Sequence, residues 1–168
     1  MKKIVLTSLV ASLFILSAYG QEGFAAKAGL NNITARVDLG AFGGTVSDGE
    51  LGFFVGGGYN FEVDDTWDIE PSALLSFVDD LTSLYIPVMA KYKFGEGFNV
   101  QAGPQLNILL EDVPDGAVGI DIAFGGGYQI DDNWFVEARF GIEVARGGDF
   151  GDITSYNTLT LGAGYRFL

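Results

Sequence analysis

The sequence predicts an all-β protein, an eight-stranded antiparallel up-and-down β-barrel that crosses a membrane. Three observations predict this fold class. The chain opens on an apolar leader-like segment, and eight later segments alternate apolar and polar residues with a period of two. No apolar stretch after the leader approaches the ~20 residues that a membrane-spanning helix needs.

Residues 1–20 have the features of a cleavable signal peptide. Lys2 and Lys3 give a positive start, residues 4–16 are an almost unbroken apolar run, and Ala18 and Gly20 place small residues at a peptidase site. We therefore expect export and a single mature domain, residues 21–168. The chain contains no Cys, which excludes a lipid-anchored cysteine, disulfides and thiol chemistry.

The mature chain is strongly acidic. The whole sequence has 9 Lys and Arg against 22 Asp and Glu, and removing Lys2 and Lys3 leaves seven against 22, a formal charge of −15. Because such a surface repels phosphate backbones, nucleic acid is not expected as a partner. Two classes remain, a soluble exported β protein and a membrane barrel.

Eight segments carry the alternation, most of them about ten residues long, the length that a tilted strand needs to cross a bilayer. The first is the weakest, and the last ends in aromatic residues. In chain order they are residues 24–30, 51–63, 67–77, 84–94, 98–108, 118–130, 134–144 and 159–167.

A repeat supports the count of strands. Tyr59, Tyr92, Tyr128 and Tyr165 recur at intervals of 33, 36 and 37 residues, and each of the first three is followed by a short polar turn and a strand that opens on Trp or Phe. One repeat therefore predicts one hairpin. The other connections are longer and acidic (residues 31–50, 79–83, 111–117 and 146–157), an asymmetry that places the short turns on the periplasmic side. The connection 31–50 is the expected location of any specificity.

Aromatic residues gather at the short-turn end of the hairpins. Such residues are typical of a girdle, in which amphipathic rings lie at the level of the lipid headgroups. The predicted girdle consists of Tyr59, Phe61, Trp67, Tyr92, Phe94, Phe98, Tyr128, Trp134, Tyr165 and Phe167.

The polar face of the strands carries charges of both signs. An eight-stranded barrel has an interior that side chains can fill, and buried charges there need partners. We therefore predict an inward charge network and an apolar face toward lipid, with inward glycines leaving space for long charged side chains. The predicted network consists of Lys27, Glu62, Asp68, Glu70, Lys91, Lys93, Asp121, Glu137, Arg139, Glu143 and Arg166.

Three prolines lie inside predicted strands. Pro71, Pro87 and Pro104 each remove a donor from the hydrogen-bond ladder, and a closed barrel has no free edge that would tolerate this. We therefore expect β-bulges or strand ends at these positions.

The residues also resemble a known family. The segment "LYIPVMAKYKFGEGFNVQAGPQLNILL" (residues 84–110), together with "DIEPSALLSF", "GAGYRF" and "FAAKAGL", is similar to the porin-family outer-membrane β-barrel domain, in particular its PorT-like group. The resemblance implies a location in the outer membrane of a Gram-negative envelope and insertion by the outer-membrane assembly machinery. Prolines of the family match Pro71, Pro87 and Pro104, whereas Leu168 after Phe167 departs from a terminal Phe. The family implies a location but no shared activity.

No catalytic site is predicted. The chain has no His, which removes Ser-His-Asp and His-metal chemistry, and no cofactor is expected. The pairs Glu137 with Glu143 and Asp68 with Glu70 are interpreted as lumen ions. Asp149 and Asp152 are interpreted as part of a solvated loop, and residues 125–127 as packing glycines without the Lys of a phosphate loop.

Three functions therefore remain open for a membrane barrel. The first is a closed barrel that anchors in lipid and acts through its loops, as a structural or binding element. The second is a narrow passive porin-like channel, and the third is an accessory component of a secretion or envelope-maintenance machine with a protein partner. Conductance separates the first two, co-purification tests the third, and membrane fractionation separates all three from a soluble binding module.

Overall fold

The computed structural model describes residues 23–38, 45–79, 81–110, 117–147 and 154–167. None of these residues forms a helix that is long and apolar enough to span a membrane. All regular structure among them is β-strand: β1 (Phe24–Asp38), β2 (Thr45–Tyr59), β3 (Phe61–Glu62), β4 (Trp67–Val78), β5 (Leu81–Phe94), β6 (Phe98–Leu109), β7 (Val118–Gln129), β8 (Trp134–Arg146) and β9 (Thr154–Arg166).

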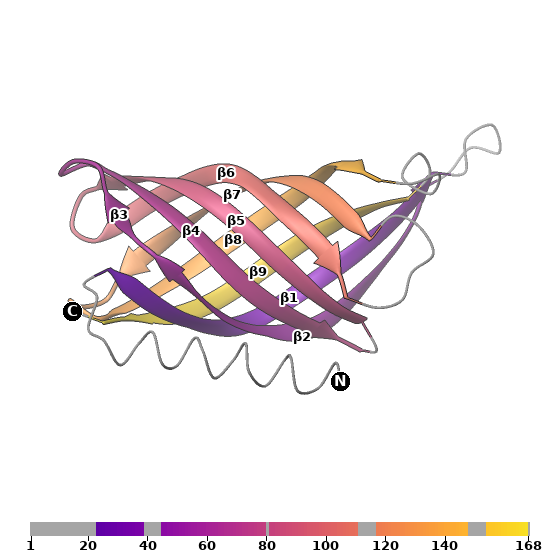
Figure 1. Cartoon of the computed structure of the whole chain (residues 1–168), viewed down its shortest axis with the longest axis horizontal. Helices are drawn as coiled ribbons and strands as arrows, with labels where there is room; N and C mark the ends of the chain where they lie inside the picture. The colour runs from indigo at the N-terminus through magenta and orange to yellow at the C-terminus, as the bar shows by residue number, and fades with distance from the viewer. Residues whose placement is uncertain (1–22, 39–44, 80, 111–116, 148–153, 168) are drawn as a thin grey trace.

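The strands form one closed antiparallel barrel (Figure 1). Neighbours in the chain pair with each other, and β1 also pairs with β9 from Ala25↔Arg166 to Val37↔Thr154, which closes the sheet. The short β3 continues the line of β2 beyond Asn60, and both pair with β4. The barrel therefore has eight antiparallel strands in its circumference, as the sequence predicts.

The strands are staggered around the barrel. A row of paired residues that starts at Trp67 in β4 passes through Tyr92, Val100, Gly126 and Ala138, and it continues around the barrel through β9, β1 and β2. It returns to β4 at Phe77, ten residues beyond its start. Such a stagger tilts the strands and fixes an interior that eight strands can fill with side chains. Figure 1 shows the resulting oblique crossing.

Short turns gather at one end of the barrel, together with the first and last paired residues. Asp64 accepts hydrogen bonds from the backbone N–H of Thr66 (2.7 Å) and Trp67 (2.8 Å). Asp131 accepts the equivalent bonds from Asn133 (2.9 Å) and Trp134 (2.7 Å). Both turns are therefore capped by a local aspartate, as is common in tight turns, which explains the aspartate three residues before each Trp.

The expected connection at residues 31–50 is wrong. β1 and β2 remain paired to Asp38↔Thr45, and β1 pairs with β9 to Val37↔Thr154, so most of that segment continues the sheet beyond the expected strand ends. Alternation of apolar and polar residues marks a strand only where one face is buried or covered by lipid. In residues 31–38 the outward face continues with polar residues, Asn32 and Thr34, so the pattern does not reveal the strand although the backbone forms a regular ladder. Two other connections are also shorter than expected, since β5 begins at Leu81 and β9 at Thr154.

The bulges expected at the prolines are also wrong. Pairing keeps one register on both sides of Pro71, Pro87 and Pro104. A proline removes a donor but inserts no residue, so the ladder loses a bond without shifting. The register shift that the structure does show lies between Ile120 and Asp121, where Val144 of β8 is the extra residue.

Candidate functional site: the barrel lumen

Inward and outward side chains of the barrel differ sharply in chemistry. Outward residues such as Ile122 (48% exposed) and Phe124 (46% exposed) are apolar and uncovered, whereas inward Glu70 and Asp121 are fully buried. Apolar residues outside and ions inside are the reverse of a soluble domain. The lumen, rather than a surface cleft, therefore holds most of the polar chemistry of the described chain.

Five charged side chains form one ionic cluster inside the barrel: Lys27, Glu70, Lys91, Glu137 and Arg139. Glu70 accepts hydrogen bonds from Lys27 and, at 2.8 Å, from Lys91. Glu137 lies 3.0 Å from Lys27, 3.2 Å from Arg139 and 3.8 Å from Lys91. Three cations thus share two carboxylates, and mutual pairing is what makes their burial tolerable.

The spacing of the cluster along its strands is regular. Lys27, Glu70 and Glu137 each lie three residues after the aromatic residue that opens its strand, and Lys91 lies three residues before Phe94, which ends β5. An odd spacing from an outward aromatic residue places all four inward. The cluster therefore lies in the half of the lumen nearer the short turns.

An apolar plug occupies the lumen toward the other end of the barrel. Ile33, Phe54, Leu74, Val78 and Tyr85 are buried against one another. The sequence pattern does not predict this plug, because it marks the inward face only by glycines and charged residues. Phe54 stands among glycines and Leu74 beside an equally apolar Leu75, so strict alternation does not identify either as a core residue.

Polar residues without full hydrogen bonding line the rest of the lumen. Asn31 donates to Ser76 (2.6 Å) and Gln105 donates to Asp121 (2.8 Å). Other buried atoms have no hydrogen-bond partner among the described residues; these include both amide atoms of Gln101, Oδ1 of Asn107, Oδ1 of Asp121 and the three guanidinium nitrogens of Arg139. Such atoms need solvent or a ligand to be satisfied.

Four of the predicted network residues lie at the short-turn mouth. Lys93 pairs with Asp68 (2.8 Å) and with Glu62 (3.2 Å). Glu62 is exposed, with 69% of its side-chain surface accessible, so the structure places it outside the lumen and corrects that assignment. Asp68 is buried. Arg166 extends over the ring of Phe135, 5.8 Å from its centroid.

Glu143 lies near the opposite mouth and pairs with Arg146, which the sequence pattern places in a loop. Arg146 Nε donates to Glu143 at 3.0 Å, and its guanidinium lies 4.7 Å from the ring centroid of Tyr156. Period-two counting along β8 turns residue 146 outward. The extra residue at Val144 reverses the parity of the strand and brings Arg146 inward.

Inward glycines make room for rings and for neighbouring strands more than for long ions. A Cβ on Gly162 would lie 2.6 Å from the ring of Phe54, and one on Gly164 would lie 2.1 Å from the ring of Phe135. A Cβ on Gly125 would meet a backbone carbonyl of the next strand at 2.0 Å. The predicted role of these glycines is therefore corrected, although at Gly119 the neighbouring group is indeed the Arg146 guanidinium.

The ten aromatic residues of the predicted girdle lie together around the short-turn end. Trp67 packs against Tyr92, Phe98 against Tyr128, and Trp134 against Tyr165, with ring centroids 4.6 to 5.2 Å apart. Further ring contacts join Phe94 to both Tyr92 and Phe98, Phe167 to Tyr165, and Tyr59 to Phe61. Phe24, which the prediction omitted, joins the girdle through Phe167.

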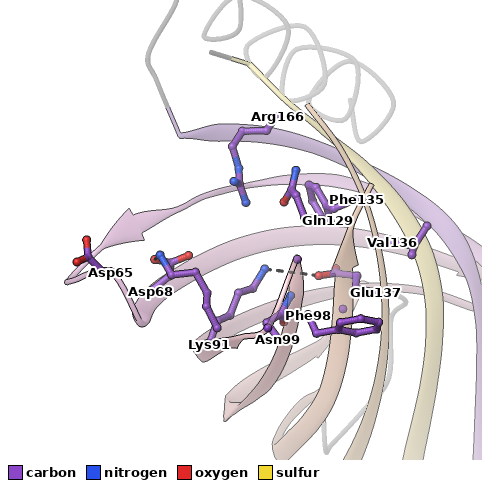
Figure 2. A pocket seen from close by; sticks show the side chains of 14 residues that line it. Asp65, Asp68, Lys91, Phe98, Asn99, Gln129, Phe135, Val136, Glu137 and Arg166 are labelled. Atoms are coloured by element: carbon purple, nitrogen blue, oxygen red, sulfur yellow. Dashed lines mark ion pairs between the residues drawn. The ribbon is translucent and has the colours of Figure 1, made fainter. Parts of the chain in front are cut away.

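A cavity of about 320 Å³ opens at the short-turn mouth. Figure 2 shows Lys91 and Glu137 on its inner side, and Arg166 and Gln129 entering from other strands. The described residues contain no group of Asp and Glu arranged to hold a metal ion. Asp149 and Asp152 lie outside the described residues.

A closed antiparallel barrel with an apolar exterior and an ionic interior has the architecture of a transmembrane β-barrel. The family model "Outer membrane protein beta-barrel domain" matches residues 6–167, and the chain belongs to that family. Membership implies a location in the bacterial outer membrane. No match was found among curated proteins.

Solved structures show the same fold at low sequence identity. Neisserial surface protein A is 15% identical, with a TM-score of 0.57 over 86% of this chain and 97% of the other. A chain from the de novo design of transmembrane β-barrels is 9% identical, with a TM-score of 0.52 over 87% and 97%. The designed barrel TMB2.3 is 12% identical, with a TM-score of 0.50 over 84% and 96%. A fold shared with designed barrels carries no activity of its own.

Proposed function

We propose that the protein is an outer-membrane barrel with a closed, side-chain-filled lumen, which anchors in lipid and acts as a structural or binding element through its longer connections. The observation that carries this proposal is closure at two levels. The ionic cluster closes the lumen inward of the cavity at the short-turn mouth, and the apolar plug closes it toward the other end. Their central side chains, Glu70 (0% exposed) and Phe54 (2% exposed), exclude solvent from both sides.

Opening the lumen at the ionic cluster would cost considerable free energy. A passing ion would have to displace Lys27 or Lys91 from two carboxylates that both of them share. Removing one partner from such a buried pair costs about 3–5 kcal/mol. A steady current would therefore require a rearrangement of the cluster rather than a small side-chain motion.

Conductance in a planar lipid bilayer tests the proposal. Refolded protein, with insertion verified by heat-modifiable gel mobility, should give no steady conductance, while a general porin in the same bilayer reports that the assay works. Stable single-channel steps that change size in Lys91→Gln or Arg139→Gln would refute closure, because they would show that these side chains line an aqueous path.

A narrow passive channel is the second candidate, and one observation favours it. Gln101, Asn107, Asp121 and Arg139 place unpartnered polar atoms along the lumen, a pattern that a thread of water would satisfy. Such a thread would carry water and protons before larger ions. Proton flux into dye-loaded vesicles, at a rate that depends on the amount of inserted protein, would favour this candidate over a sealed barrel.

The route to the membrane is also a proposal. Residues 1–20 would be removed during export, and the outer-membrane assembly machinery would insert the mature chain, in the manner expected of the PorT-like group. N-terminal sequencing of protein from outer-membrane fractions should then begin at Gln21. A start at Met1, or recovery as a detergent-free monomer, would contradict this route. Co-purification of a defined envelope protein would support the accessory role.

A further inference from the structure

The cavity at the short-turn mouth ends on an aromatic wall surrounded by cations. Phe135 is 5% exposed and lines the cavity. Its ring centroid lies 5.4 Å from Lys27 Nζ, 5.5 Å from Lys91 Nζ and 5.8 Å from the Arg166 guanidinium. Three cations thus approach one ring, and two of them, Lys91 and Arg166, also line the cavity.

The charges at this mouth balance in number but not in position. Lys93 contacts two carboxylates, Asp68 and Glu62, whereas deeper in the lumen Lys27, Lys91 and Arg139 share Glu70 and Glu137. Among the side chains that the structure describes, Arg166 is the one cation with no carboxylate partner, and its Nε is buried without a hydrogen bond.

The two acids that offset this charge in number, Asp65 and Glu62, are exposed at the rim, where water screens them. The inner part of the cavity therefore holds one unneutralised guanidinium.

Arg166 is held in position by its backbone. Its N–H donates to the Asn133 carbonyl at 2.7 Å, and the Asn133 side-chain amide donates to the Arg166 carbonyl at 3.0 Å. The strand end is thus fixed on both sides of the residue, and Figure 2 shows its side chain directed into the cavity. A guanidinium fixed in this way presents a planar pair of donors, the geometry that suits a carboxylate or phosphate.

We infer that the cavity at the short-turn mouth binds a small solute with one net negative charge, through a carboxylate or phosphate group. Arg166 binds the oxyanion, Lys91 adds positive potential from the inner side, and Phe135 provides an apolar wall for the rest of the solute. The volume is at the lower end of small-molecule sites. Because Phe135 and the ionic cluster close the inner side, binding does not depend on whether the barrel conducts.

Titration of the refolded barrel in nanodiscs tests this inference. The probes are sodium acetate, sodium benzoate and inorganic phosphate, and the readout is the NMR shift of the backbone amides of Asn99 and Gln129, which line the cavity and remain in every variant. We expect saturable binding of at least one probe. Tighter binding of phosphate than of acetate would assign a phosphate ligand, the reverse order a carboxylate ligand, and tighter binding of benzoate than of acetate would assign the Phe135 wall to the site.

Three variants isolate the guanidinium. Arg166→Gln should weaken binding at least about tenfold, the effect of losing a charge-assisted hydrogen bond. Arg166→Lys keeps the charge but not the planar donor pair, so its affinity for the probe should lie between those of the wild type and of Arg166→Gln. It also provides the test if the glutamine variant does not refold. Arg146→Gln, the same change at the opposite mouth, should bind as the wild type does. No saturable shift with any probe, or equal affinity in both Arg166 variants and the wild type, would overturn the inference.

Discussion

Replacing Glu70 by Gln removes one of the two carboxylates that neutralise Lys27, Lys91 and Arg139. The amide keeps the shape of the side chain but offers a neutral oxygen where two ammonium groups now donate. Three buried cations would then face Glu137 alone, and Lys91 lies 3.8 Å from it. Loss of one partner from a buried ion pair costs about 3–5 kcal/mol, and we expect the free energy of unfolding to fall by that amount.

The assay is urea unfolding of the barrel in lipid vesicles, followed by tryptophan fluorescence. The chain has two Trp residues, Trp67 and Trp134, and both lie in the aromatic girdle, so their emission reports removal from lipid. Glu62→Gln is the matched control, because its carboxylate is 69% exposed and its pair with Lys93 is 3.2 Å long. That variant should lose less than about 1 kcal/mol. Equal losses for the two variants would refute the reasoning.

A double-mutant cycle sharpens the same prediction. Lys27→Met in the wild type leaves Glu70 with Lys91 as its remaining cation, whereas in the Glu70→Gln background it removes a cation that has become surplus. The second cost should therefore be smaller, with a coupling of about 0.5–3 kcal/mol. Additive costs would indicate that Lys27 and Glu70 do not act as a pair.

Two further substitutions test the packing of the lumen and the orientation of the outer face. Gly164→Ala should destabilise the barrel by about 1–3 kcal/mol in the same unfolding assay, because its Cβ would overlap the Phe135 ring; Gly126→Ala, whose nearest neighbour is a carbonyl at 3.1 Å, should cost less. Equal costs would contradict the ring contact. Ile122→Arg, at mid-strand on the outer face, should lose about 2–4 kcal/mol in vesicles, whereas Val63→Arg near a turn should lose about 0–1 kcal/mol. A larger loss at Val63 would place the bilayer elsewhere.

The barrel itself could be predicted from the sequence because the forces that specify it act on residues close together in the chain. Lipid requires apolar residues at every second position, and short hairpins require polar turns, so both leave a pattern in consecutive residues. The spacing of Tyr59, Tyr92, Tyr128 and Tyr165 identified the hairpins for the same reason. The continuation of β1 and β2 beyond the expected strand ends lacks this pattern, because the outward positions Asn32 and Thr34 are polar and the ladder is formed by the backbone.

The lumen was predictable in composition but not in arrangement. Inward charges could be found from parity, yet which of them meet depends on the stagger of the strands, a global property that no single segment encodes. Lys27 and Glu70 are neighbours across strands that are far apart in the sequence. Counting every second residue as inward also fails where a strand contains an extra residue. At Val144 such an extra residue turns the Arg146 side chain inward. The apolar plug was missed because a filled lumen needs volume as well as charge.

Two independent layers, the ionic cluster and the apolar plug, close the lumen, so opening it should require changes in both. Phe54 lies in a row that continues through Gly29 and Gly162 to Glu137, and the two glycines contribute no side chains. The Phe54 ring therefore fills the space beside the ionic cluster, and its tip is the atom nearest to a Cβ on Gly162 (2.6 Å). Removing this ring creates a gap that the cluster still blocks, whereas removing Glu70 disrupts the cluster beneath an intact ring.

We therefore expect Phe54→Ser and Glu70→Ser to remain non-conducting as single variants, and the double variant to show steady conductance in a planar bilayer. Each variant must first show heat-modifiable mobility, since loss of a buried Phe alone costs about 3–5 kcal/mol. Conductance from Phe54→Ser alone would mean that the ionic cluster passes ions. A folded double variant that stays silent would mean that Leu74 and Tyr85 seal the lumen without Phe54, and that the plug closes this barrel by itself.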